Sequence, residues 1–123
     1  MLNNIHYSLG YDLKKKNNDD HSYSTQSHFK KSIKHYEQCY NLSQKIEDKI
    51  GILESLKGLG NCSLELGKYD EAIKNYEKCA QRAIDFKEIN SKVEAYCQIV
   101  KAYILNGDSN DEYKTYFDEI LRI

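Results

Sequence analysis

The chain has 123 residues and a formal net charge of −1, from 18 basic and 19 acidic side chains. A chain of this length can bury its own core as one domain, without a disulfide framework or a structural metal. The near-neutral balance argues against a general nucleic-acid binder, which needs an excess of basic side chains to neutralise phosphates. No segment has the character of a membrane span or a signal peptide. We therefore expect a soluble, cytoplasmic protein.

The first predicted helix covers residues 2–15, and a polar stretch without helical periodicity follows it. This stretch, residues 15–24, is rich in Lys, Asn, Asp and Ser, which are common in loops. We predict an extended loop here, either a tolerated insertion or a contact surface.

The next three predicted helices cover residues 25–45, 49–66 and 68–86. Apolar residues recur at helical spacing on both sides of Gly67, which separates the last two helices. They are Leu53, Leu56 and Leu59 before the glycine, and Tyr69, Ala72, Ile73, Tyr76 and Ala80 after it.

The last two predicted helices cover residues 92–106 and 110–122. A serine precedes the start of each helix, and a glutamate lies three residues after that serine. The pairs are Ser91 with Glu94 and Ser109 with Glu112. This spacing is typical of a capping box, in which both side chains satisfy the first N–H groups of a helix. We therefore expect these helices to begin near Lys92 and Asn110.

A repeat of 40 residues runs through most of the chain. The segment from Ile33 to Cys39 recurs from Ile73 to Cys79 with five of seven residues identical, and Gly67 recurs as Gly107. A period of this length indicates a stack of similar helix pairs. We divide the single domain into repeats at about 1–48, 49–90 and 91–123.

The middle repeat carries a recognisable pattern. Leu56-x-x-Leu59-Gly60-x-x-Ser63, then Gly67-Lys68-Tyr69-Asp70-Glu71-Ala72, Tyr76 and Ala80, resembles a tetratricopeptide repeat. Leu56 stands where an aromatic residue is usual, and the closing proline is absent. The period of 40 is longer than the family's standard of about 34 and is similar to that of the long-repeat subgroup of rapsyn and G-protein-signalling modulators.

This resemblance implies an all-α fold, a right-handed superhelical stack of about six helices in antiparallel pairs. The first helices of such a stack line a concave groove that binds a protein or peptide partner. With Gly60 packed against its partner helix, the opposite side of helix 49–66 carries Glu54, Lys57, Asn61, Leu64 and Glu65. Equivalent residues elsewhere are Tyr11 in the first repeat and Lys101 in the third. The resemblance therefore predicts an adaptor.

Lys57 and Asn61 are one helical turn apart, so both could reach one carboxylate. Their spacing is similar to the start of a carboxylate clamp, with Gln98 where the next Asn of a clamp is expected. The same Leu59-Gly60-Asn61 run also resembles the signature of signalling-modulator repeats, in which Asn grips an extended partner. A sensor of small peptides is a further alternative.

Catalysis and cofactors are not expected. The chain lacks a phosphate loop and a nucleophile elbow. His21, His28 and His35 are seven residues apart, which places neighbouring rings about 10 Å apart along a helix, too far for one metal ion. Cys39 and Cys79 occupy equivalent positions, where we expect reduced thiols that fill the core.

The last helix carries apolar residues that still need cover. Tyr113, Tyr116, Phe117 and Ile120 predict a surface for self-association. The alternative function is therefore a structural subunit, for example of a cytoskeletal or ciliary assembly, that stacks through its ends.

Overall fold

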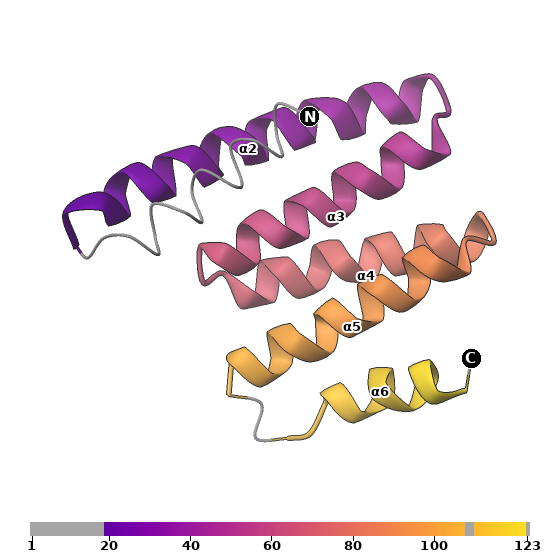
Figure 1. Cartoon of the computed structure of the whole chain (residues 1–123). Helices are drawn as coiled ribbons and strands as arrows, with labels where there is room; N and C mark the ends of the chain where they lie inside the picture. Colours follow the sequence, from indigo (N-terminus) through magenta and orange to yellow (C-terminus); the bar gives the residue numbers. More distant parts are fainter. Residues whose placement is uncertain (1–18, 108–109, 123) are drawn as a thin grey trace.

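The computed structural model describes the backbone of residues 19–107 and 110–122, with side chains described from Ser24 onward. Its helices are α2 (Asp19–Lys45), α3 (Lys49–Glu65), α4 (Tyr69–Asp85), α5 (Ile89–Leu105) and α6 (Tyr113–Leu121). Successive helices run antiparallel and form one row, with α2 and α6 at opposite ends (Figure 1). The predicted all-α stack of helix pairs is confirmed. The predicted helix 2–15 lies outside the described residues.

Tight turns with the same backbone geometry recur every 20 residues, two in each 40-residue repeat. Helix α5 begins at Ile89 and ends at Leu105, each 40 residues after its counterpart in α3. In the three turns before α3, α4 and α5, the middle residue has a positive φ: Glu47, Gly67 and Lys87. The N–H of the next residue donates back to a carbonyl of the preceding helix, as from Lys68 to Ser63 at 2.9 Å. These bonds close each helix and start the next after three residues.

The core lies between α3, α4 and α5. One cluster joins Leu53 and Leu56 of α3 to Cys79 and Ala83 of α4, and a second joins α4 to α5 through Ile99 and Ala102. Tyr76 has an exposed fraction of 0% in the second cluster. A Cβ atom added at Gly60 would lie 2.5 Å from Cε1 of Tyr76, so only glycine lets this ring pack against α3. The predicted contact of Gly60 with its partner helix is confirmed.

The predicted loop at 15–24 is wrong where the structure describes it. Helix α2 begins at Asp19, six residues before the predicted start of 25. No proline occurs in the chain and no glycine lies between Gly10 and Gly51, so polar residues here do not interrupt a helix. Residues 15–18 lie outside the described range.

The predicted capping box of Ser91 with Glu94 is not found. Helix α5 begins at Ile89 with Glu88 as its N-cap, which makes no side-chain capping bond, so Ser91 lies inside the helix. The tight turn starts the helix directly, because the Glu88 N–H donates to the carbonyl of Ala83 at 2.8 Å. Helix α6 begins at Tyr113 and not near Asn110, and Ser109 lies outside the described residues.

The one side-chain cap that the structure shows among its described helices was not predicted. The Asp48 Oδ1 atom accepts a hydrogen bond from the Gly51 N–H at 3.1 Å, at the start of α3. A capping box requires a Glu or Gln three residues after the N-cap, but the residue three positions after Asp48 is Gly51.

The predicted core role holds for Cys79 but not for Cys39. Cys79 is 2% exposed and packs between α3 and α5, whereas Cys39 is exposed on α2. The two positions are equivalent in the repeat, but α4 lies between two described helices and α2 lies at the end of the described stack (Figure 1). Burial of this position therefore depends on the neighbours and not on the residue type.

Candidate functional site

Helices α3 and α5 share one polar surface, which we call the α3/α5 face. It is built from Glu54, Lys57 and Asn61 of α3 with Glu94 and Lys101 of α5. The two helices approach each other at Lys57, whose Nζ atom lies 3.1 Å from Oε1 of Glu54 and 3.3 Å from Oε1 of Glu94. One lysine therefore joins equivalent glutamates of successive repeats.

The Lys57 side chain is only 26% exposed, so its charge is partly shielded from water. Burial by itself lowers the pKa of Lys57, but the hydrogen bond and the charge of Glu54, with the charge of Glu94, outweigh it and raise the pKa. Lys57 thus stays protonated and its charge is balanced within the chain. The positive charge available to an incoming carboxylate is correspondingly reduced.

Asn61 is bound from within the chain as well. Its Oδ1 atom accepts a hydrogen bond from the Tyr76 hydroxyl at 2.5 Å, and the residue is half-buried. The contact forms because Gly60, one residue earlier, lets the Tyr76 ring lie against α3. The side-chain oxygen of Asn61 is therefore already used to orient the buried Tyr76 and is less available to a partner protein.

The other predicted binding residues differ in their exposure to solvent. Glu54 and Lys101 are exposed on the α3/α5 face, as predicted. Leu64 is only 7% exposed and packs with Ala72 and Ile99, so its predicted place on the partner-binding surface is wrong. Its equivalent in α5, Ile104, is 59% exposed. Tyr11 lies outside the described residues.

Gln98 lies half-buried on α5, at the position equivalent to Gly58 of α3. Its Oε1 atom is buried and has no hydrogen-bond partner among the described residues. A Cβ atom at Gly58 would lie 2.3 Å from the Tyr36 ring, so the equivalent position in α3 is filled by an aromatic neighbour. The buried Oε1 atom of Gln98 therefore faces the interior of the stack.

The residues predicted for self-association differ in how far they are buried within the chain. The Tyr116 ring contacts the rings of Tyr96 and Tyr103, with centroids 5.6 and 6.0 Å apart, and its hydroxyl donates to Glu77 at 2.6 Å. Tyr113 and Ile120 are half-buried. Phe117 is 47% exposed. Tyr116 thus holds α6 to the rest of the chain, and Phe117 faces solvent.

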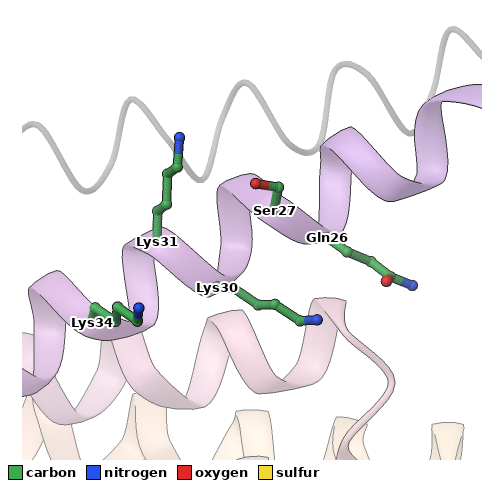
Figure 2. A pocket seen from close by; sticks show the side chains of 5 residues that line it. All are labelled: Gln26, Ser27, Lys30, Lys31 and Lys34. Carbon is green, nitrogen blue, oxygen red and sulfur yellow. The ribbon is translucent and has the colours of Figure 1, made fainter.

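A shallow hollow lies along α2 and is lined by Gln26, Ser27, Lys30, Lys31 and Lys34. In Figure 2 the side chains of Gln26 and Lys30 point to the opposite side of α2 from that of Lys31. An anion site would require lysines that converge on one point, and these lysines do not.

The described residues offer no evident catalytic or metal centre. Within 24–107 and 110–122, no three His, Cys, Asp or Glu side chains gather where they could hold a metal ion. Burial raises the pKa of the Cys62 thiol to about 12 and that of Cys79 to about 11, which suppresses the reactive thiolate. Among the same residues, no helix has the length and hydropathy of a membrane span.

Comparison with known proteins agrees with this architecture. A TPR repeat-containing protein of Methanocaldococcus jannaschii, MJ1428, is 34% identical over 98 residues, which cover 75% of this chain but only 16% of that protein. The crystal structure of the TPR domain of Arabidopsis FLU has the same fold, with a TM-score of 0.70 at 20% identity over 98% of this chain and 92% of that domain. The family model of the tetratricopeptide repeat matches residues 21–85. The chain therefore belongs to the tetratricopeptide-repeat family.

Proposed function

We propose that this chain is a protein-interaction module whose α3/α5 face binds an extended or helical segment of a partner protein. The observation that supports this most is the contact of Lys57 with both Glu54 and Glu94. It makes one continuous surface from two helices that are 40 residues apart in sequence. Polar side chains at regular spacing along such a surface can bind the backbone and the charged groups of a peptide.

The proposed partner segment carries basic and apolar groups in preference to a terminal carboxylate. Lys57 is already balanced by two glutamates, which leaves Glu54 and Glu94 to attract a cation. Further along α5, Lys101 is followed by the exposed Ile104 and Leu105, 59% and 51% exposed, which can receive an apolar side chain. A carboxylate clamp is disfavoured because Lys57 is already paired with Glu54 and Glu94.

A selection from a random peptide library tests this proposal. We expect wild-type protein to enrich peptides with a basic residue near an apolar one, and Glu94→Lys to reduce their affinity at least tenfold. Lys78→Glu is the matched control, because Lys78 is exposed on α4, away from the α3/α5 face. Peptides that bind Glu94→Lys and wild type equally would place the binding surface elsewhere.

Asn61→Ala is a poor test by itself. The substitution removes the acceptor of the Tyr76 hydroxyl, which lies in the core, so it costs about 1–3 kcal/mol of stability whether or not a partner binds. Lys101→Glu avoids this cost, because Lys101 is exposed.

We also propose that the chain belongs among the long-repeat members of its family. The 40-residue spacing of α3 and α5 supports this assignment.

The same library selection addresses the peptide-sensor alternative, since a sensor would bind short free peptides as tightly as it binds the same sequences within a protein.

A further inference from the structure

Two hollows lie along the edge of the stack that carries the α2–α3 and α4–α5 turns (Figure 1). The first hollow, of about 370 Å³, is lined by Gln44, Glu47, Lys49, Ile52, Arg82 and Phe86. The second hollow, of about 350 Å³, is lined by Ala83, Ile84, Lys87, Glu88, Ile89 and Lys92. Four positions of the first hollow, moved by 40 residues, fall on the second: Gln44 on Ile84, Glu47 on Lys87, Lys49 on Ile89 and Ile52 on Lys92. The same hollow therefore recurs with the repeat.

The first hollow combines an apolar floor with two cations. Ile52 is buried in the core cluster of α3 and α4, and Phe86 is half-buried against that cluster. The Lys49 Nζ atom lies 5.5 Å from the centre of the Phe86 ring. Arg82 is half-buried and lies four residues before Phe86, in the last turn of α4. An apolar surface thus lies directly beside an ammonium and a guanidinium group.

These cations are not balanced within the part of the chain that the structure describes. Among those residues, Lys49 and Arg82 form no ion pair, and the same holds for Lys87 and Lys92 of the second hollow. Each hollow has two cations and one glutamate, in a chain whose net charge is −1. The cations occupy different positions in the two hollows, so the positive charge recurs although the residues do not.

This combination selects the chemistry of a ligand. The planar N–H donors of Arg82 match a carboxylate, and the Lys49 ammonium adds a second positive charge. The Phe86 ring offers contact area to an apolar side chain. An inorganic anion would use only the cations and leave the apolar floor exposed. A peptide with an acidic residue near an apolar one would use both.

From these observations we propose that the first hollow binds an acidic segment of a partner protein. A carboxylate of the segment lies against Lys49 and Arg82, and an apolar side chain lies against Phe86. The second hollow extends the same chemistry along the edge. The proposal uses a surface separate from the α3/α5 face and a partner segment of opposite charge, so it can fail while the proposed function stands.

Fluorescence anisotropy of the full chain with a short labelled peptide, which combines Asp and Glu with Phe and Leu, tests this inference. We expect Lys49→Glu to raise the dissociation constant about tenfold, and Arg82→Gln to raise it in the same direction. Lys68→Glu is the matched control, because Lys68 is exposed in the α3–α4 turn, on the opposite edge of the stack (Figure 1). Circular dichroism checks that each variant keeps its helical content.

Two further peptides test the chemistry of the ligand. Replacing the acidic residues by Asn and Gln, or the apolar residues by Ser, should weaken binding in either case. Equal binding of either peptide, no binding of the acidic one, or no effect of both Lys49→Glu and Arg82→Gln would overturn the proposal. An equal effect of Lys68→Glu would do the same, since it would indicate attraction by net charge alone. Binding of phosphatidylserine vesicles in place of the peptide would assign the hollow to a lipid surface and also overturn it.

Discussion

Helices α4 and α6 occupy equivalent places in successive repeats, yet α4 contributes six buried residues and α6 none. Among the differences between the helices that they pack against, one lies at the contact with this tyrosine position. Gly60 of α3 admits the Tyr76 ring, and Val100 stands at the equivalent position of α5. Tyr116, the equivalent of Tyr76, instead lies beside Tyr96 and Tyr103 and remains half-buried.

This comparison shows that a glycine on the first helix of a repeat lets the tyrosine of the second helix pack closely. The second helix is also buried by the helix on its other side, and among the described helices α4 packs against both α3 and α5. The comparison also separates two kinds of tyrosine contact. The Tyr76 hydroxyl donates to a half-buried amide, and the Tyr116 hydroxyl donates to an exposed carboxylate. The middle repeat thus supplies the stable core, and the last repeat supplies a weakly held surface helix.

The largest effect that we expect comes from filling the space at Gly60. Gly60→Val should lower the free energy of unfolding by about 3 kcal/mol or more, because the fully buried Tyr76 ring cannot move aside. Val100→Gly should cost only about 1 kcal/mol, the cost of glycine within a helix. Urea denaturation measures both, and equal losses would refute the role assigned to Gly60.

Alkaline pH should destabilise the middle repeat next. Burial raises the pKa of Cys62 from 9.0 to about 12 and that of Cys79 to about 11, so the folded chain holds protons that the unfolded chain releases. Stability from these thiols is complete below pH 9.0 and falls as pH rises through the folded pKa values. We expect each of the two thiols to contribute a loss of roughly 2 kcal/mol by pH 11.

Thermal melts between pH 8 and 11 measure this loss. The double variant Cys62→Ala with Cys79→Ala should flatten the dependence of melting temperature on pH. Cys97→Ala should leave it unchanged, because Cys97 is exposed on α5. The raised pKa of Tyr36, about 12 through its burial, acts in the same direction and leaves a residual slope.

The turns offer a smaller contrast. Gly67 and Lys87 hold equivalent places after α3 and α4, with φ of +75° and +60°. Gly67→Ala should lower the free energy of unfolding by about 1 kcal/mol, because a side chain is strained at this φ, and Lys87→Gly should raise it by about 0.5 kcal/mol. Opposite signs in urea denaturation would support this account, and a loss in both variants would contradict it.

The smallest effect concerns the ion pairs of the α3/α5 face. Lys57→Met should cost less than about 1 kcal/mol, since the glutamates that it leaves behind are exposed and become hydrated. The cost should shrink further at high salt, because salt screens charges near the surface. A cost of several kcal/mol that does not depend on salt would mean that Lys57 acts as a core residue.

The helical spacing of apolar residues and the glycine turns were predictable, whereas the side-chain caps and the start of α2 were not. The spacing of Leu53, Leu56 and Leu59 placed helix 49–66 within one residue of α3, and the recurrence of Gly67 as Gly107 marked two turns of positive φ. Glu47 and Lys87 in the equivalent turns were not found, because neither residue type favours that conformation. Local propensity thus accounts for the helices and for half of these turns.

The sequence by itself determined the all-helical fold, the period of 40 residues and the close contact of Gly60 with the next helix. These depend on periodicity and on the size of single residues. Only the tertiary structure decided that Leu64 is buried and Ile104 exposed, that Cys79 fills the core and Cys39 does not, and that Lys57 bridges two glutamates. Equivalent positions have the same place on a helix, but their burial depends on which neighbouring helices cover them.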